Sequence, residues 1–245
     1  MELPVDRWAG AVEERAKHVP LQYILGSQPF GELNIKCRPG VLIPRNETEE
    51  WCERLKEVVE KIPDKVSVVD YCTGTGCVAL SMATLSNVEK ITAFDIDESA
   101  LRLARENLKL NKDLLQTPVS FEKGNLLQEK HPKLAATLLL SNPPYIPEKD
   151  FNLQGGVEQS VLLYEPRSAL VGDLEFYTAL AELLRTGSFK AFVFEIGYRE
   201  QALHTKKLLP AWTCGIRTDS HGNVRNVVGW QQEWNALRSM CDELL

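Results

Sequence analysis

Short apolar runs separated by segments of helical periodicity are the feature that most constrains the fold of this chain. The runs are continuously apolar rather than alternating, which is typical of strands covered by helices on both faces of a parallel sheet. The predicted strands are residues 66–71, 91–95, 119–122, 137–140 and 191–196. The predicted helices are residues 46–62, 78–85, 99–111 and 174–184. This alternation indicates an α/β fold with a doubly wound, Rossmann-like sheet.

Smaller elements are predicted toward both ends. Residues 214–218 and 226–230 flank a turn-forming segment, which predicts a C-terminal antiparallel hairpin. Residues 8–17 fit a short helix. Residues 21–41 are strand-like and interrupted by glycine and proline, which predicts a small N-terminal β-arm.

The main domain is expected to begin with the helix at Asn46. The Asn46 side chain can cap this helix, and Glu49 three places later can complete a capping box. We therefore expect two parts: residues 1–45 as a short helix and β-arm, and residues 46–245 as the main domain.

The composition excludes several classes of protein. The chain carries 28 basic and 34 acidic residues, a net charge of -6, which argues against general capture of DNA or RNA. The six cysteines include no CxxC pair and no histidine at ligand spacing, so no metal site is expected. The first residues lack the apolar core of a signal peptide, and no run is long and apolar enough for a bilayer. We expect reduced thiols in an intracellular protein without a membrane partner.

A glycine turn follows the first predicted strand. The segment Asp70–Gly76 contains Gly74 and Gly76, which let the backbone turn sharply and approach a ligand, while the following helix offers free N–H groups. The next strand ends at Asp95, nineteen residues past Gly76, followed by Ile96. A carboxylate there can accept hydrogen bonds from both ribose hydroxyls. This context predicts binding of S-adenosyl-L-methionine.

The glycine turn has two other interpretations, a dinucleotide site and a purely structural turn. A dinucleotide site carries GxGxxG, whereas here Cys77 and Ala79 stand after Gly76, so that pattern fails. A purely structural turn also needs glycine. The cofactor would also contact Cys72 and Thr73 inside the turn. Asn125, after the third strand, can meet the adenine edge or form a plain turn.

A second loop, Ser141-Asn142-Pro143-Pro144-Tyr145, follows the fourth strand and should face the same crevice. Two prolines supply no N–H, so the polar groups of the loop are mainly acceptors. The Asn142 side-chain oxygen and the Pro143 carbonyl can each accept a hydrogen of a planar NH₂ group. They would aim its lone pair at a methyl donor and stabilise the developing positive charge. Tyr145 offers an aromatic wall.

Three alternatives compete with methylation of an amide. Asn-Pro-Pro alone can be an ordinary loop after a buried strand. A nucleic-acid amino methyltransferase uses the same chemistry but must flip a base into the pocket, and the acidic charge and lack of a basic, aromatic-rich segment argue against it. A non-catalytic adenosine binder has no need of two acceptors beside the methyl group.

The sequence resembles the HemK/PrmC family of protein glutamine N5-methyltransferases over about residues 20–230. The matching blocks are Pro20–Gly26, Ile43–Glu49, the glycine turn, Ser141–Pro147, Tyr164–Leu170, Glu195–Tyr198, and Asp219 with Gly222 and Arg225. The Asn-Pro-Pro-Tyr loop is shared with DNA adenine and rRNA guanine methyltransferases. The blocks at residues 44–49 and 164–167 narrow the match to this family.

The resemblance implies a class-I methyltransferase fold that consumes S-adenosyl-L-methionine and releases S-adenosyl-L-homocysteine. It implies that Asn142 and Pro143 hold the glutamine of the Gly-Gly-Gln loop in a class-I peptide-chain release factor. Asp95 would hold the ribose, and Asp70 with Gly74 would lie along the methionine. Pocket-wall residues would be Arg45 and Glu47 from the segment 44–49. For Glu165 and Arg167, a structural ion pair and a substrate contact stay equally open.

The sequence departs from the family in three places. Cys72 stands where glycine is usual, and Asn125 where an acidic residue is usual. Members begin with a helical domain of several dozen residues, whereas fewer than twenty residues precede Leu21 here. The short N-terminal segment and the sequence of residues 46–51, Asn-Glu-Thr-Glu-Glu-Trp, favour a eukaryotic member of the family. For a eukaryotic member the resemblance implies a mitochondrial location, and for a bacterial member a cytoplasmic one.

Overall fold

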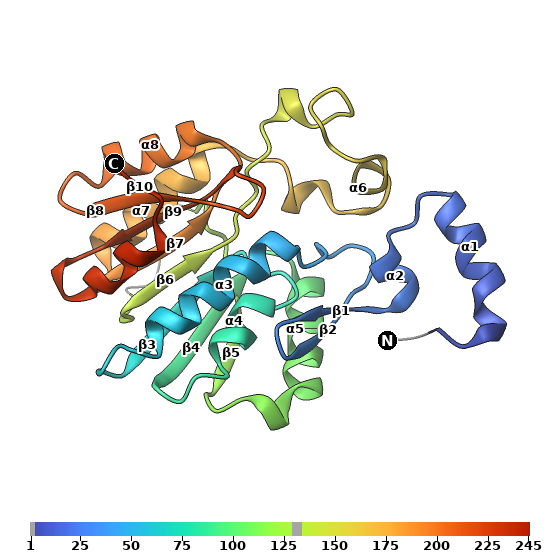
Figure 1. Ribbon diagram of the computed structural model, residues 1–245, viewed down its shortest axis with the longest axis horizontal. Coiled ribbons are helices and arrows are strands. Elements are labelled where there is room, and N and C mark those ends of the chain that lie inside the picture. The colour runs from blue at the N-terminus through green and yellow to red at the C-terminus, as the bar shows by residue number, and fades with distance from the viewer. Residues whose placement is uncertain (1–2, 129–133) are drawn as a thin grey trace.

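A computed structural model describes residues 3–128 and 134–245 of the chain. Its centre is an eight-stranded sheet with the strand order β10-β8-β9-β7-β6-β3-β4-β5 (Figure 1). The strands are β3 (Val66–Tyr71), β4 (Val88–Asp95), β5 (Val119–Lys123), β6 (Leu138–Ser141), β7 (Ala191–Glu195), β8 (Thr213–Thr218), β9 (Val224–Trp230) and β10 (Glu243–Leu244). Strands β3 to β7 run parallel, and β9, β8 and β10 are antiparallel. The predicted doubly wound sheet and the C-terminal hairpin are confirmed.

The strand order reverses beside β3. From β3 the chain continues outward through β4 and β5, then crosses back so that β6 pairs with the other edge of β3. Tyr71 at the end of β3 lies in register with Ser141 at the end of β6. Ligands bind open α/β sheets at such a reversal, outside the carboxyl ends of the strands. The topology therefore brings the glycine turn and the Asn142 loop side by side.

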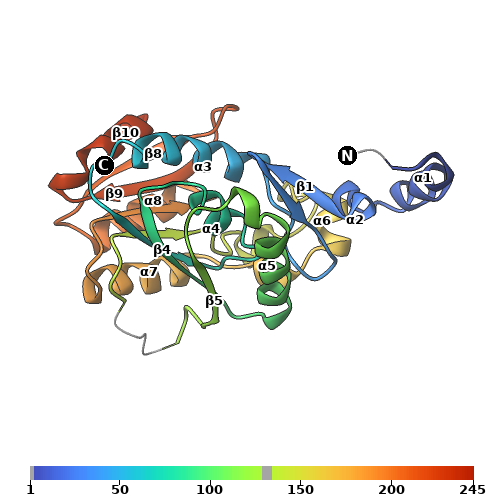
Figure 2. The same ribbon diagram turned by 90° about the horizontal axis from the view of Figure 1, so that it is seen from below.

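Helices cover both faces of this sheet (Figure 2). Alternate residues of each strand face opposite ways, so Val68 and Leu138 pack in one core and Val69 and Leu139 in the other. The first core contains α3 (Asn46–Val59), α4 (Cys77–Met82), α5 (Glu98–Leu110) and the 3₁₀ segment η5 (Gln232–Met240). The second core contains α7 (Leu174–Thr186) and α8 (Arg199–Leu208).

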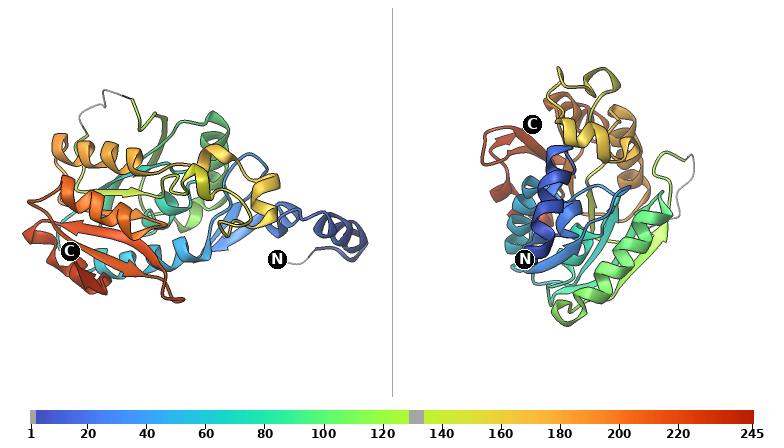
Figure 3. Two further views of the ribbon diagram at one scale, coloured as in Figure 1. Left: turned by 90° about the horizontal axis from the view of Figure 1, so that it is seen from above. Right: turned by 90° about the vertical axis from the view of Figure 1, so that its right-hand side faces the viewer.

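The N-terminal segment forms the predicted arm. It contains η1 (Val5–Arg7), α1 (Trp8–Ala16), α2 (Leu21–Leu25), β1 (Ser27–Phe30) and β2 (Leu33–Lys36). The β1–β2 hairpin is held against α5, because Asn111 Oδ1 accepts from the Asn34 amide (2.9 Å) and Asn107 Oδ1 from the Lys36 amide (2.8 Å). The helix α1 projects beyond the sheet at the end opposite the C-terminus (Figures 1 and 3). The remaining short elements are η2 (Lys112–Leu114), η3 (Glu148–Asp150), α6 (Gln159–Tyr164) and η4 (Arg167–Ala169).

The predicted capping box at the start of α3 is wrong. Arg45 occupies the N-cap position and makes no side-chain cap hydrogen bond, while Asn46 is already helical. The Asn46 side chain instead accepts from Gln28 Nε2 (3.3 Å), and Glu49 accepts from the Gly31 amide (2.9 Å). Both side chains fasten the hairpin to the helix. Tertiary partners replaced the local cap.

Three helices depart from the sequence prediction, and α6 (Gln159–Tyr164), which was not predicted, is one of them. Leu21–Leu25 is helical rather than strand-like, with Gly26 closing the helix at a φ of 81°. The helix α8 was not predicted, because it is polar and buries only Gln201, Ala202 and Thr205. Tyr198 occupies the N-cap position, a residue type outside the usual N-cap set, and its amide donates to the Gln201 side chain (3.1 Å). No helix in residues 3–128 or 134–245 has the length and apolarity needed to cross a bilayer.

Candidate active site

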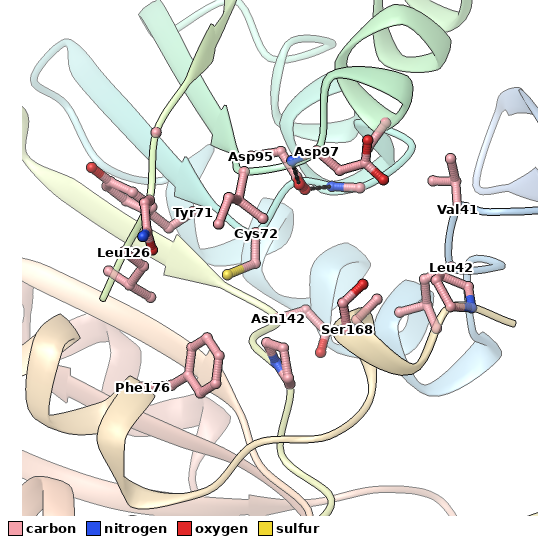
Figure 4. A pocket seen from close by; sticks show the side chains of 18 of the residues that line it. Val41, Leu42, Tyr71, Cys72, Asp95, Asp97, Leu126, Asn142, Ser168 and Phe176 are labelled. Carbon is pink, nitrogen blue, oxygen red and sulfur yellow. Dashed lines mark hydrogen bonds between the residues drawn. The ribbon is translucent and has the colours of Figure 1, made fainter. Parts of the chain in front are cut away.

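Two adjoining cavities open at the carboxyl ends of the parallel strands. Their volumes are about 200 Å³ and about 30 Å³. The residues that line both are Leu42, Cys72, Gly74 and Asn142. Figure 4 shows Cys72 and Asn142 near the centre of the larger cavity, with Asp95 on one side and Phe176 on the other. The two loops singled out from the sequence therefore meet at one place.

The glycine turn bends through three residues with positive φ. The φ angles are 61° at Cys72, 55° at Gly74 and 80° at Gly76. Gly74 faces both cavities, whereas Gly76 lines neither and packs behind the turn, where a Cβ would lie 3.0 Å from the Phe121 ring. A side chain in the left-handed region costs about 1–2 kcal/mol, so Cys72 places strain where the family usually has glycine.

Asp95 ties the end of β4 to this turn. Its Oδ2 accepts from the Gly74 amide (2.8 Å) and its Oδ1 from the Asp97 amide (2.9 Å). Burial raises the pKa of this carboxyl, and the backbone hydrogen bonds oppose that effect. Asp97 caps α5 by accepting from the Ser99 amide (2.7 Å). Asp95, Ile96 and Asp97 all line the larger cavity.

Asp70 is a buried carboxylate in the wall of the smaller cavity. It is 1% exposed, and its Oδ2 accepts from the Thr73 hydroxyl (2.6 Å). Its Oδ1 has no hydrogen-bond partner within the described part of the chain. Burial raises the pKa of Asp70 to about 7. An unpartnered buried oxygen of this kind favours a cationic ligand group, because desolvation without a partner is costly. The ammonium of a bound amino acid meets this requirement.

One end of the larger cavity is formed by the apolar side chains of Leu126 and Phe176, whereas Val41 lies at the opposite end (Figure 4). Asn125 also lines this cavity, with its Oδ1 accepting from the Leu127 amide (2.9 Å). The Asn125 side chain therefore does both things: it stabilises its own turn, and it forms part of the cavity wall. Apolar walls around one amide suit a flat heterocycle.

The Asn142 loop follows β6, whose last residue anchors it through the Ser141 hydroxyl donating to the Tyr71 carbonyl (2.8 Å). Asn142 Nδ2 donates to Thr48 Oγ1 (3.3 Å). The Tyr145 carbonyl accepts from Gln201 Nε2 (2.9 Å), and its hydroxyl donates to Glu195 Oε1 (3.3 Å). These contacts come from α3, α8 and β7, so the loop is held by three distant elements.

The structure does not bring every predicted residue of this loop into the cavities. Asn142 lines both cavities and Pro144 the larger one. Pro143 and Tyr145 line neither, and the Tyr145 ring packs against Gly197. The predicted aromatic wall for the substrate is therefore not seen at Tyr145, whose ring belongs to the support behind the loop.

Glu195 is the centre of that support, and sequence reasoning gave it no role. It is fully buried at 0% exposure, and its Oε2 accepts from Thr48 Oγ1 (2.7 Å) and Trp51 Nε1 (2.8 Å). Burial raises the pKa of Glu195, and the hydrogen bonds from Trp51 and Thr48 lower it. Glu195 and Thr48 do fall within blocks that carried the family resemblance. Gln201 falls in no such block and had no sequence signal.

Of the residues predicted to form the substrate wall, Arg45 lies in a cavity wall and Glu47 does not. Arg45 lines the smaller cavity and forms an ion pair with Glu165 (2.6 Å), whose side chain is 1% exposed. Glu165 also accepts from the Ile43 amide (3.0 Å). Arg167 does not pair with Glu165; it contacts Glu148 and lies over the Phe151 ring. Glu47 lines neither cavity.

No three His, Cys, Asp or Glu side chains converge on a possible metal position in the described ranges. The six cysteines all lie in these ranges and all are free thiols. Burial is the largest influence on the Cys72 thiol and raises its pKa. A thiol that stays protonated is a poor nucleophile, so the chemistry of the site rests on oxygen acceptors.

The chain is similar in sequence to known methyltransferases, as the geometry of the site leads one to expect. The model of the Methyltransferase small domain matches residues 45–161. The mitochondrial MRF1 N(5)-glutamine methyltransferase MTQ1 of Saccharomyces cerevisiae is 40% identical, over 94% of this chain and 76% of its own length. The probable counterpart in Schizosaccharomyces pombe is 36% identical, over 89% and 77%. The release factor glutamine methyltransferase of Streptococcus pneumoniae is 36% identical, over 88% and 76%.

Solved structures share the fold. The hMettl16 catalytic domain, in complex with a 3'UTR hairpin, superposes with a TM-score of 0.62 at 18% identity, over 86% of this chain and 81% of that chain. A methyltransferase from Pyrococcus furiosus gives 0.55 at 16% identity, over 92% and 97%. At these identities only the fold is shared. The sequence relatives are closer, and by them the chain belongs to the family of release factor glutamine methyltransferases, which are S-adenosyl-L-methionine-dependent enzymes.

Proposed function

We propose that this protein methylates the side-chain amide nitrogen of the glutamine in the Gly-Gly-Gln loop of a class-I peptide-chain release factor, in support of translation termination. The observation that carries the proposal is the meeting of the glycine turn and the Asn142 loop at one pair of cavities. The identity to release factor methyltransferases selects glutamine over a nucleic-acid base.

The residues around the cavities fit S-adenosyl-L-methionine. When bound, this cofactor supplies an electrophilic methyl group on a sulfonium. Asp70 would hold the methionine ammonium with its unpartnered Oδ1, together with Thr73 and Gly74. Asp95 would accept from the ribose hydroxyls, and Asn125 would lie beside the adenine in the apolar end. Cys72, Gly76 and Ile96 would shape this surface without charged contacts.

The Asn142 loop would hold the glutamine. Its two acceptors, Asn142 Oδ1 and the Pro143 carbonyl, would each take one hydrogen of the glutamine NH₂. An amide nitrogen is a poor nucleophile because its lone pair is delocalised, and two fixed acceptors favour pyramidal geometry at nitrogen. The same oxygens would stabilise the positive charge that develops on nitrogen as its bond to the methyl group forms and the bond between that methyl group and the sulfonium breaks; the nitrogen would then release a proton to solvent. Pro144 would close the cavity beside the reacting groups, and Tyr145 would brace the loop.

The remaining parts fit the same proposal. Arg45, which lines the smaller cavity and is fixed by Glu165, would lie on the path by which the release-factor loop enters, and Glu47, which lines neither cavity, would meet that loop only outside them. We propose that residues 1–45 form a short helical and β-hairpin arm and that residues 46–245 form the catalytic methyltransferase domain. Two relatives are named as mitochondrial, so we propose the mitochondrion as the compartment.

Mass spectrometry of a purified mitochondrial release factor after incubation with this chain and the cofactor tests the proposal. One methyl group is expected on the peptide that contains Gly-Gly-Gln, with S-adenosyl-L-homocysteine formed in equal amount. A release factor whose loop glutamine is replaced by alanine is the matched control and should stay unmodified. Methylated RNA beside an unmodified glutamine would exclude the proposed substrate.

A further inference from the structure

The Asn142 side chain raises a problem that its own loop cannot solve. A side-chain amide has an acceptor oxygen at one end and a donor NH₂ at the other, and both ends have nearly the same shape. Only the oxygen end can hold a substrate NH₂ group. The neighbouring Pro143 and Pro144 have no N–H with which to bind the Asn142 oxygen and so select one orientation. Some other group must set the direction of the amide.

The Thr48 hydroxyl is placed to do this. A hydroxyl has one hydrogen to donate. Thr48 donates that hydrogen to Glu195 Oε2 (2.7 Å), so toward Asn142, at 3.3 Å, its oxygen can only accept. An Asn142 oxygen turned toward Thr48 would meet a second acceptor with no hydrogen between them. The NH₂ end of Asn142 must therefore face Thr48, and the oxygen end must face away.

Glu195 fixes the direction of the Thr48 hydroxyl. It is 0% exposed, and each group that bonds to its carboxylate is a donor: Thr48 and Trp51 at one oxygen and the Tyr145 hydroxyl at the other. With a donor at each of its oxygens, the Glu195 carboxyl acts as an acceptor toward Thr48. Thr48 itself is 2% exposed and lines the smaller cavity, so bulk water does not compete at this position.

We propose that Thr48 and Glu195 are positioning residues that set the polarity of the Asn142 amide, so that its oxygen faces the substrate nitrogen. The direction of the hydrogen bonds runs from Asn142 to Thr48 to Glu195, from the cavity into the core beneath α3. This inference rests on the proposed role of Asn142 and adds the reason that its amide has one orientation. Thr48 touches neither reacting atom in this scheme.

Two substitutions at Thr48 separate polarity from packing. Thr48→Val keeps the shape and removes the hydroxyl, whereas Thr48→Ser keeps the hydroxyl and loses a methyl group. Thr48→Val is expected to lower kcat about three- to tenfold, the factor that corresponds to one neutral hydrogen bond. KM for the release factor and Kd for the cofactor should change less than twofold. Thr48→Ser should keep kcat near the wild-type value. If valine impairs folding, Thr48→Ala, which also lacks the hydroxyl, replaces it and should lower kcat by the same factor.

A double-mutant cycle with Asn142→Ala gives the decisive measurement. In that background no amide remains to be oriented, so Thr48→Val should cause no further loss of kcat. An equal loss in both backgrounds, or an unchanged kcat for Thr48→Val alone, would overturn the inference. Failure of the proposed function looks different, because the wild-type chain would then leave the release factor unmethylated.

Discussion

The two loops that meet at the cavities are held in different ways. The glycine turn after β3 is fixed mainly from within its own β-α-β unit. Thr73 donates through its amide to the Phe94 carbonyl (3.0 Å) and through its hydroxyl to Asp70 (2.6 Å), and Gly76 donates to the Thr73 carbonyl (2.8 Å). Asp95, 21 residues away, closes the arrangement at Gly74. The conformation of this turn is therefore fixed by its own glycines and by residues of the adjoining strand β4.

The Asn142 loop is fixed by distant residues. Its prolines remove the N–H groups that a self-supporting turn would use. Its side chains and carbonyls bond to Glu195, Gln201 and Thr48, which lie 50, 56 and 94 residues away along the chain. A loop built from acceptors for a substrate amine needs external donors and acceptors to hold it. Damage to remote residues should therefore reach this loop and spare the glycine turn.

Asn142→Ala should cause the largest loss of kcat, and the loss should concern the Asn142 loop and not the glycine turn. Removing a preorganised group that stabilises transition-state charge costs about 10²–10³ in kcat. Cofactor affinity should change far less, because the glycine turn does not depend on Asn142. Single-turnover rates and calorimetric binding of S-adenosyl-L-homocysteine measure the two effects. Equal losses in rate and affinity would contradict the division between the loops.

Gly76→Ala should break the glycine turn from behind. Its Cβ would meet the Phe121 ring at 3.0 Å and the Ala104 methyl at 3.1 Å, at a φ of 80°. We expect a loss of about 2–4 kcal/mol in the free energy of unfolding, from left-handed strain and overpacking together. Urea unfolding of the ligand-free protein gives the value.

Gly74→Ala is the matched control for that substitution. Its Cβ would meet no heavy atom within 4 Å, so only backbone strain of about 1 kcal/mol is expected. Because Gly74 lines both cavities, the added methyl group should weaken cofactor binding instead. Equal stability losses for the two alanines would show that the contacts with Phe121 and Ala104 do not matter.

Asp70 makes the cofactor side sensitive to pH. Burial raises the pKa of Asp70 to about 7, so below that pH the neutral carboxyl cannot pair with a cation. Cofactor affinity should fall about tenfold as the pH drops below 7, the scale of one charged hydrogen bond. Titrations of wild type and Asp70→Asn across pH 5–8 test this, since the asparagine variant should lack the dependence.

The same group has the opposite effect on the ligand-free protein. A carboxyl whose pKa is raised on folding stabilises the folded state most below its unfolded pKa of about 4, and that stability is lost as the pH rises through about 7. The difference in unfolding free energy between wild type and Asp70→Asn should therefore shift against the wild type from pH 5 to pH 8. A constant difference would contradict the burial of a charge at this position.

Gln201→Leu should give the smallest effect on catalysis, through the loss of its hydrogen bond to the Asn142 loop. The substitution removes the donor to the Tyr145 carbonyl and the acceptor for the Gly197 and Tyr198 amides. A drop of about fivefold in kcat is expected, equal to about one hydrogen bond, with cofactor affinity unchanged. Thr205→Val on the same helix is the control, because the Thr205 hydroxyl bonds only within α8 and its loss should leave kcat unchanged.

Seven of the eight strands of the main sheet could be predicted, because each has a local apolar pattern; the short edge strand β10 was not predicted. Residues 66–71 were predicted as a strand and β3 has those bounds, since a continuous apolar run suits a strand covered on both faces. The helix α8 was not predicted because two of its three buried residues are polar, so it has no apolar face. The predicted cap of α3 was wrong because the Asn46 and Glu49 side chains bond to the β1–β2 hairpin instead. Local patterns fail where a tertiary contact offers the same polar group a better partner.

The sequence by itself determined the strands, the glycines that permit the cofactor turn, and a loop composed of acceptors. Only the tertiary structure decided which side chains stand behind that loop: Thr48, Glu195 and Gln201. The reason is physical. Turn glycines and prolines act through their own backbone angles, which are local, whereas the direction of a hydrogen bond depends on where a distant partner lies. The tertiary structure alone could show that the Asn142 amide nitrogen is taken by Thr48.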